Sequence, residues 1–400
     1  MKTAFTASRL FTPLEEIQDP LLVVEDGRII EVSTRRGKEI GANVSLVDFG
    51  DAVLAPGFLD IHIHGGAGVD LMRAPAADLP RMGKFLATHG VTAYFPTTVA
   101  APLDATCTAL EKLADAIEIA QSRSAHNRPA QNQPADSDSA EAQPLGIHLE
   151  GPFLSHKRRG VHPPEYLVTP TVEIFERLWQ AARGHVRMMT IAPEIPGATE
   201  VITEAARRNV CVSIGHSDAD LLTAQNAVTA GARHATHTFN AMRPLDHRDP
   251  GIVAEVLTDD RLTADIIVDG IHVMPPVVQL FMLAKGVERA VLITDAISAT
   301  GMPDGHYQLG PIEVDVKDGK CTSGGSLAGS VLTMDRAVRN VTQFARWSLK
   351  DAVRAASLNA ARAVGLAGQH GALASGSEAN FVVMNAAGEV LKTIIQGRGY

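Results

Sequence analysis

Four histidines and two carboxylates stand at or just beyond the ends of short apolar runs. They are His62, His64, Glu150, His216, His237 and Asp295. Imidazole nitrogens and carboxylate oxygens are the ligands that proteins offer to zinc and similar divalent ions. A further carboxylate beside such an ion can move protons as a general acid or base. The residue types therefore indicate a metal site with a proton-transfer group next to it.

Each of these residues also has a purely structural interpretation. His62 and His64, two positions apart, point to the same side of a strand and could be a solvated strand end. Glu150 could bind a loop amide, His216 could be a hydrogen-bonded core histidine, and Asp295 could be a helix N-cap. These interpretations weaken jointly, because five predicted strands each end in a ligand-type residue.

The elements that must position these residues alternate between strands and helices. Eight short apolar runs lie at 54–61, 91–96, 145–149, 186–191, 210–214, 234–238, 264–268 and 290–293. Intervening segments carry apolar residues three or four apart, as in Cys107, Leu110 and Leu113. Pro275-Pro276 is typical of a helix start. This alternation predicts an α/β protein with a (β/α)8 TIM barrel, in which the strand C-termini converge on one site. A doubly wound sheet is the alternative, but no GxGxxG motif opens the first unit.

The two chain ends have a different sequence pattern from the segment between them. In residues 1–53, the runs 21–24 and 29–32 flank Asp26-Gly27, a pattern typical of a β-hairpin. Residues 366–400 repeat the pattern, with runs 381–384 and 390–395 around Gly388. Neither end has enough core to fold alone. We therefore predict one small β-sandwich domain formed from both termini, packed beside a barrel of residues 54–365.

One internal segment fits neither pattern. Residues 121–144 are rich in Ala, Gln, Ser, Asp and Pro and show no periodicity. Such a composition favours a disordered surface insertion. We expect no chemistry from it.

Composition excludes several functional classes. Hydrophobic residues make up 45% and charged residues 20%, as in an ordinary globular protein. The 36 Lys and Arg against 45 Asp and Glu give a formal charge of -9, which disfavours nucleic-acid binding but not a small phosphorylated ligand. No apolar run is long enough to span a membrane, and the N-terminus does not resemble a signal peptide. The three cysteines lie far apart and form no disulfide framework, so we expect a cytoplasmic protein.

Several linked motifs, in order along the chain, resemble a known family. The stretch PGFLDIHIHG at 56–65 resembles the first-strand signature of the amidohydrolase superfamily. Six further motifs are similar to those of its N-acetylglucosamine-6-phosphate deacetylase family: GIHLEGPF (146–153), GHSDA (215–219), THTFNAM (236–242), DGIH (269–272), TDA (294–296) and LAGSVLTM (327–334). The resemblance covers nearly the whole chain outside 121–144.

The resemblance implies a metal-dependent hydrolase that removes the N-acetyl group of N-acetyl-D-glucosamine 6-phosphate, giving D-glucosamine 6-phosphate and acetate. It implies Glu150, His216 and His237 as metal ligands and Asp295 as the catalytic acid/base. The implied substrate contacts are Val161, His162, Asn240, Ala241, Arg248, Asp269, Gly270, Ile271, His272, Leu327, Ala328 and Gly329. Among them, His162 would also stabilise the developing oxyanion, and Arg248 would hold the 6-phosphate with help from His272.

The resemblance leaves the number of metal ions open at one or two per chain. Some family members lack the strand-one histidines and use one ion, whereas this chain keeps His62 and His64. Glu150 would then bridge two ions in place of the superfamily's carboxylated lysine. The alternative is that His62 and His64 are relics beside a single ion. Zinc is the expected metal, with iron, manganese or cobalt as alternatives.

Alternatives to the substrate also remain. N-acetylgalactosamine 6-phosphate differs from the gluco substrate only in the configuration of one hydroxyl. A few contacts would decide which of the two epimers is preferred. Another amidohydrolase class acts on cyclic amides or deaminates its substrate. The implied contact between Arg248 and a phosphate argues against this class. A non-enzymatic relative would have lost ligands that this chain retains. We also expect a homodimer, with no nucleic-acid or membrane partner.

Overall fold

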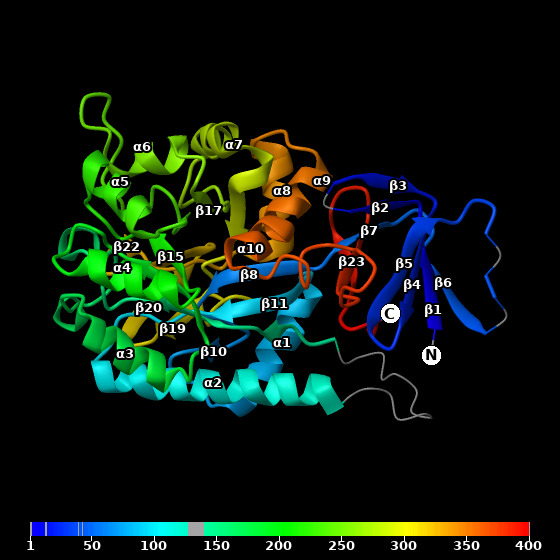
Figure 1. The fold of residues 1–400 in the computed structure, drawn as a ribbon, viewed down its shortest axis with the longest axis horizontal. Coiled ribbons are helices and arrows are strands. Elements are labelled where there is room, and N and C mark those ends of the chain that lie inside the picture. The colour runs from blue at the N-terminus through cyan, green and yellow to red at the C-terminus, as the bar shows by residue number, and fades with distance from the viewer. Residues whose placement is uncertain (1, 13, 39, 42, 127–139, 400) are drawn as a thin grey trace.

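The computed structural model describes residues 2–12, 14–38, 40–41, 43–126 and 140–399 of the chain. Figure 1 shows a larger part, in which helices surround strands, and beside it a smaller all-β part that holds both chain ends. The larger part positions the candidate site.

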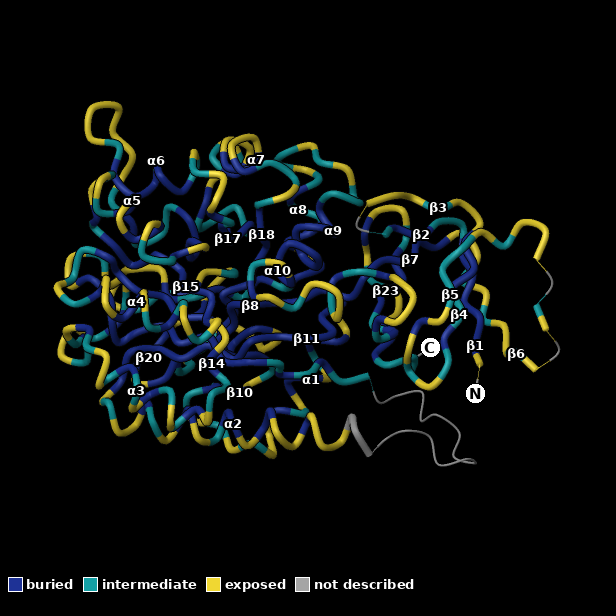
Figure 2. The backbone as a smooth tube through the Cα atoms, viewed as in Figure 1, coloured by how far each residue is buried: buried dark blue, intermediate teal, exposed yellow. Residues whose placement is uncertain are grey.

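Parallel strands form the centre of the larger part. They are β8 (Phe58–Ile63), β11 (Val91–Pro96) and β12 (Gln143–Pro144) in one sheet, and β13 (Ile147–Glu150), β14 (Val186–Ile191), β15 (Cys211–Ile214), β16 (His234–Ala235), β17 (Thr263–Ile267) and β18 (Ala290–Ile293) in the other. Nearly all their residues are buried, as expected for parallel strands covered on both faces. Figure 2 shows these strands as a buried interior beneath exposed outer turns.

Backbone hydrogen bonds join the two parallel sheets at both edges. Thr98 N donates to His148 O (3.0 Å) beside the ends of β11 and β13. Asp295 N donates to His62 O (2.9 Å) between the ends of β18 and β8. The strands are therefore arranged like those of a TIM barrel, and the predicted α/β class is confirmed.

Helices cover the outside of the strands. They are α1 (Leu79–Thr88), α2 (Leu103–His126), α3 (Val172–Ala181), α4 (Ala198–Arg207), α5 (Leu221–Ala230), α6 (Gly251–Thr258), α7 (Pro275–Arg289), α8 (Met334–Phe344), α9 (Leu349–Ala356) and α10 (Leu358–Ala363), with short 3-10 helices η1 (Ala76–Asp78), η2 (His156–Arg158) and η3 (Pro164–Tyr166). Local chemistry sets their starts: Thr171 Oγ1 accepts from Ile174 N (3.2 Å) before α3, and α7 begins at Pro275 as predicted. No helix in the described ranges has the length and apolar character needed to cross a bilayer.

The smaller part contains two sheets. The four-stranded sheet has the order β5-β4-β1-β6, and the five-stranded sheet has the order β24-β23-β7-β2-β3. Their bounds are β1 (Lys2–Thr6), β2 (Arg9–Phe11), β3 (Glu16–Gln18), β4 (Pro20–Glu25), β5 (Arg28–Thr34), β6 (Val44–Asp48), β7 (Val53–Pro56), β23 (Phe381–Met384) and β24 (Val390–Ile394). The predicted hairpin is present, and both turn residues, Asp26 and Gly27, have the positive φ (49° and 77°) that its Asp-Gly turn requires. Phe5 and Phe381, from opposite chain ends, pack edge to face with ring centroids 5.1 Å apart.

The predicted strand at 54–61 is wrong in one respect, because it is two strands. β7 pairs with β23 in the smaller part, whereas β8 belongs to the parallel strands. Gly57 separates them, and a Cβ atom there would lie 2.2 Å from Thr92 Cγ2. The chain can therefore change sheets at this point only because the residue has no side chain.

The predicted disordered insertion at 121–144 is also wrong at both of its ends. Residues 121–126 continue α2, and β12 at Gln143–Pro144 pairs with β11. The first residues of the segment extend a helix that is already formed, which needs no new nucleus. The remainder of the prediction, at 127–139, lies outside the described residues.

A four-stranded antiparallel sheet follows β18 and was not foreseen. It consists of β19 (Gly305–Leu309), β20 (Ile312–Lys317), β21 (Lys320–Ser323) and β22 (Ser326–Leu327), and two short strands, β9 (Gly65–Gly66) and β10 (Val69–Asp70), pair nearby. Its inner face forms a buried cluster with Val99, Ile297 and Ala299. This sheet therefore packs directly against the segments that follow β11 and β18.

Candidate active site

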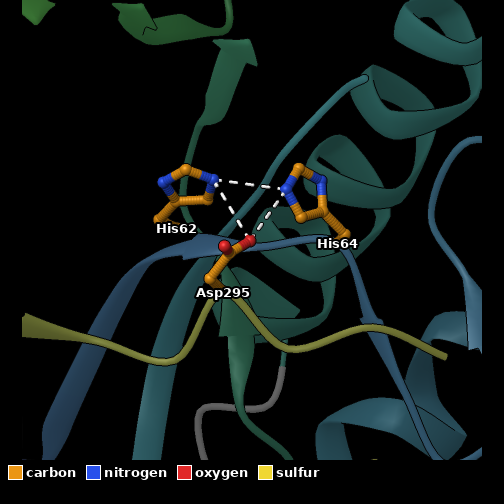
Figure 3. Close-up of side chains that lie close together, drawn as sticks. All are labelled: His62, His64 and Asp295. Atoms are coloured by element: carbon orange, nitrogen blue, oxygen red, sulfur yellow. Dashed lines mark hydrogen bonds and ion pairs between the residues drawn. The ribbon is translucent and has the colours of Figure 1, made fainter. Parts of the chain in front are cut away.

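The ends of β8 and β18 bring three predicted residues together. Figure 3 shows His62, His64 and Asp295 converging on one point. The Nε2 atoms of His62 and His64 lie 3.2 Å apart, and Asp295 Oδ1 lies 3.1 Å from His64 Nε2 and 3.6 Å from His62 Nε2. His62 and His64 are two positions apart on β8 and its extension, so both rings face the same side as the pleat predicts.

Glu150, at the end of β13, lies between two groups of histidines. Its Oε1 is 3.2 Å from the Nε2 atoms of both His216 and His237, and these two nitrogens are 3.1 Å apart. Its Oε2 is 3.2 Å from His64 Nε2 and 3.3 Å from His62 Nε2. One carboxylate therefore faces both groups, one oxygen to each.

The hydrogen bonds on the far sides of two rings fit a metal site. His64 Nδ1 lies 3.2 Å from Thr97 O, and His216 Nδ1 lies 2.9 Å from Arg158 O. A carbonyl can only accept, so Nδ1 carries a proton in each ring and Nε2 is the nitrogen that faces the centre. Ring nitrogens and carboxylate oxygens this close together are stable only around a cation, which is either a proton or a metal ion. The donor set therefore fits a divalent ion.

Charges within the site reinforce one another. Burial alone would lower the pKa of His64, but hydrogen bonds with Asp295 and Glu150 outweigh it and raise this pKa to about 10. Burial opposes ionisation of Asp295 as well, yet the nearby His62 and His64 hold its pKa below the usual range. The same balance, with His62, His216 and His237, holds the pKa of Glu150 well below its usual value. Both carboxylates are therefore ionised at neutral pH.

His162 differs from the other histidines of the site. Its Nδ1 accepts a hydrogen bond from Ala100 N (3.1 Å), so the proton lies on Nε2, which is 3.9 Å from Glu150 Oε2. Burial, with a contribution from His216, lowers the pKa of His162 to about 3. The ring is therefore neutral and can act as a hydrogen-bond donor.

The segment after β16 is fixed by a buried acid. Asp265 on β17 accepts a hydrogen bond from His237 N through Oδ1, and its other oxygen, Oδ2, lies 2.9 Å from His234 Nε2. Asp265 O also accepts from Thr238 N (2.9 Å). His234 and Asp265 are both 0% exposed. His237 has a φ of 29°, a backbone conformation that persists only when its surroundings impose it.

A cavity of about 190 Å³ is lined by six of the residues described above: His64, Glu150, His162, His216, His237 and Asp295. Its polar side chains include Asn240 and His272, and its apolar side chains include Val99, Leu309 and Ile312. These three apolar residues belong to one buried cluster and so form an apolar side of the cavity. Asp269 accepts hydrogen bonds from Ile271 N and His272 N, and its Oδ2 lies 2.7 Å from His272 Nδ1. His272 is thereby oriented from behind.

A model of the amidohydrolase family matches residues 53–399. This chain belongs to the amidohydrolase family. Among curated relatives, N-acetylglucosamine-6-phosphate deacetylase of Bacillus subtilis (strain 168) is 36% identical over 97% of this chain and 94% of its own length. N-acetylgalactosamine-6-phosphate deacetylase of Escherichia coli O157:H7 is 35% identical over 100% and 99%. A variant of N-acetyl-D-glucosamine-6-phosphate deacetylase from Mycobacterium smegmatis, solved in complex with N-acetyl-D-glucosamine-6-phosphate, is 33% identical, with a TM-score of 0.89 and coverage of 99% and 98%. The resemblance inferred from the motifs is confirmed.

In this amidohydrolase, most of the predicted site residues line the cavity. They are His64, Glu150, Val161, His162, His216, His237, Asn240, Ala241, His272, Asp295, Leu327 and Gly329. His62 is not part of the lining and is 0% exposed. Asp269, Gly270, Ile271 and Ala328 are neighbours of lining residues rather than part of the lining.

Arg248 is also outside the cavity lining and, unlike Asp269 to Ile271 and Ala328, does not adjoin a lining residue in the sequence. It is exposed, on the loop between β16 and α6, and its backbone nitrogen donates to Asp246 Oδ1 (2.9 Å). Its role at the phosphate therefore stays a prediction.

Sequence reasoning missed other residues of this amidohydrolase's site. Val99, Leu309 and Ile312 line it, and Asp265 with His234 supports it. The alternation of Ile312, Val314 and Val316 could have indicated a strand. Nothing in that pattern shows which part of the molecule the strand covers.

Proposed function

We propose that this amidohydrolase cleaves the N-acetyl group of N-acetyl-D-glucosamine 6-phosphate, releasing acetate and D-glucosamine 6-phosphate. The observation that carries the proposal is the convergence of Glu150, His216 and His237 with an ionised Asp295 and a neutral His162 in one cavity. The names of relatives that match nearly the whole chain supply the substrate class.

Each side chain of the site has a separate role in the proposed hydrolysis. A divalent ion held by Glu150, His216 and His237 would supply Lewis acidity for amide hydrolysis. Asp295, ionised at neutral pH, takes the proton of the attacking water and passes it to the leaving nitrogen. His162 donates a hydrogen bond from Nε2 to the carbonyl oxygen of the amide, which becomes negatively charged when water attacks. His272, oriented by Asp269, binds the substrate on the polar side, and Arg248 is proposed as the partner of the 6-phosphate.

Acetate release from a panel of N-acetyl hexosamines tests this function. The panel contains the 6-phosphates of the gluco and galacto epimers, their unphosphorylated forms and a cyclic amide. We expect the gluco 6-phosphate to have the highest kcat/KM. The galacto 6-phosphate is the second candidate, because the Escherichia coli relative matches all of this chain. Turnover of the cyclic amide alone would contradict the proposal. Arg248→Ala should lower kcat/KM for the phosphorylated substrates selectively, whereas equal losses on both forms would remove Arg248 from the phosphate site.

We further propose that two ions bind, with zinc as the expected metal and iron, manganese or cobalt as alternatives. The support is that Glu150 directs one oxygen to each group of histidines. Metal titration should reach two ions per chain for the wild type and one for the double variant His62→Ala, His64→Ala. If both proteins stop at one ion with equal activity, His62 and His64 do not form a second site.

The domain organisation is proposed on the same basis. The two terminal sheets share a buried cluster that includes Phe5, Leu22 and Phe381, which supports a β-sandwich of residues 1–53 and 366–400 beside a barrel of residues 54–365. A homodimer and a cytoplasmic location remain predictions from the sequence.

A further inference from the structure

The cavity has an apolar side to which the proposed chemistry assigns no role. Val99, Leu309 and Ile312 line it and are 2%, 3% and 6% exposed. All three belong to the buried cluster beneath the β19–β22 sheet, together with Ile297 and Ala299 just after Asp295. The apolar side is therefore continuous with a packed core rather than a loose surface loop.

This side lies next to the group that would receive the carbonyl oxygen. His162 is held by the backbone nitrogen of Ala100, and Val99 is the preceding residue. An amide carbonyl carbon bears two substituents, the acyl chain and the sugar nitrogen. The polar lining, with Asn240 and His272, suits a hydroxylated and phosphorylated sugar. The acyl chain is then left to the apolar side.

Two features fix the position of this wall. Asp70 accepts hydrogen bonds from Gly310 N (2.8 Å) and Met72 N (3.0 Å), so one carboxylate ties the β19–β20 turn to the segment after β10. Gly310 has a φ of 57°, and a Cβ atom there would lie 2.5 Å from Val99 Cγ2. The turn therefore sits on Val99 with no space between them, and the wall cannot retreat without breaking these contacts.

We infer that Val99, Leu309 and Ile312 form an acyl wall that limits hydrolysis to short N-acyl groups. The inference rests on the proposed function, since it assigns one part of that substrate to one side of the cavity. At a rigid apolar wall, each extra methylene of the acyl group lowers kcat/KM by about 10–200-fold. Acetyl and formyl groups should fit, and propionyl and butyryl groups should not.

The test is a series of N-formyl, N-acetyl, N-propionyl and N-butyryl glucosamine 6-phosphates, hydrolysed by the metal-loaded full-length protein. Ile312→Ala and Val99→Ala enlarge the cavity, because they remove side-chain carbons from two residues that line it. Each should raise the ratio of propionyl to acetyl kcat/KM about tenfold. Val314→Ala is the matched control, because Val314 is on the same face of β20 and 1% exposed but does not line the cavity. It should lower stability and leave the ratio unchanged.

The outcomes separate this inference from the function on which it rests. A wild type that hydrolyses the N-acetyl substrate, with ratios unchanged in both enlarged variants, overturns the acyl wall alone. A tenfold shift in Val314→Ala as well would also overturn it, because general loosening of the cluster would then explain the effect. No hydrolysis of any member by the wild type contradicts the proposed function itself. Thermal unfolding of each variant confirms that the compared proteins are folded.

Discussion

Two buried side chains of the site are kept in opposite roles by their surroundings. Burial keeps His162 neutral, with its pKa lowered to about 3, and the hydrogen bond from Ala100 leaves its proton on the side of the cavity. Asp295 is just as enclosed, but its interactions with the neighbouring His62 and His64 outweigh burial and hold its pKa below the usual range. The difference gives one hydrogen-bond donor and one proton acceptor at the same pH, which acid–base catalysis needs.

Asp295→Asn should reduce kcat by about 10²–10⁴, because an amide cannot accept the proton of the attacking water. Substrate affinity should change little. Asp295 Oδ1 is 3.1 Å from His64 Nε2, so the variant could also lose a metal ligand. Metal content, measured on the same preparation, separates the two effects. A variant with full metal content and near-normal turnover would remove Asp295 from the proton transfers.

The shortest strand of the six-stranded parallel sheet, β16, depends on a neighbouring strand for its geometry. β16 has two residues, and the ligand-type residue His237 follows it in a left-handed conformation. Asp265 on β17 accepts from the backbone of His237 and pairs with His234 on β16. The orientation of a proposed ligand is therefore determined by a carboxylate that never reaches the cavity.

Asp265→Asn should weaken metal binding by about 10–100-fold, the usual effect of changing a residue that supports a ligand. The matched control is Asp335→Asn, because Asp335 is also a buried carboxylate beside a histidine, with its Oδ1 3.0 Å from His89 Nδ1. The control should lose stability but keep its metal affinity. Competition with a chelator measures the affinity without reference to activity. Equal affinities in the two variants would contradict a positioning role for Asp265.

Elements with a strong apolar pattern were predictable from the sequence. The strands at 91–96, 186–191 and 290–293 have the predicted bounds, because every residue there is needed to fill a two-sided interior. The predicted strand at 234–238 ends early, since His237 turns out of the sheet under the influence of Asp265. That influence comes from another strand, so no local pattern could reveal it.

The candidate site was predictable to a similar degree. Residues that bear ligand chemistry, such as Glu150 and His216, were identified because their types and positions at strand ends are informative. Val99, Leu309 and Ile312 were missed because apolar residues carry no such signal. Their role depends on where the β19–β22 sheet packs, and that is a tertiary property.

At the scale of the whole molecule, the two chain ends are built into one set of sheets. Phe381 pairs with Pro56 across β23 and β7, and β7 leads through Gly57 into β8, which carries His62. The C-terminal strands therefore support the segment that enters the site. The paired chain ends are therefore connected to the candidate site by a few residues of continuous backbone.

Phe381→Ala should lower the free energy of unfolding by about 3–5 kcal/mol, because Phe381 is 0% exposed and packs on Phe5. Leu391→Ala on the adjacent strand is the control, since Leu391 is 54% exposed, and it should change stability by no more than ~0.5 kcal/mol. Urea unfolding followed by circular dichroism measures both. A loss below about 1 kcal/mol for Phe381→Ala would show that the two ends do not share a core.

The hydrogen bond between Asp60 and Thr294 joins residues that are 234 positions apart. His62 and Asp295 lie just beyond these two residues, so this group of ligand-type side chains straddles the seam where the first and last parallel strands meet. A ribosome must pass residue 295 before the seam can close. A nascent chain released earlier keeps the two histidines of β8 but has no carboxylate from the last strand to set beside them. Assembly of this group therefore marks a chain whose synthesis has passed β18.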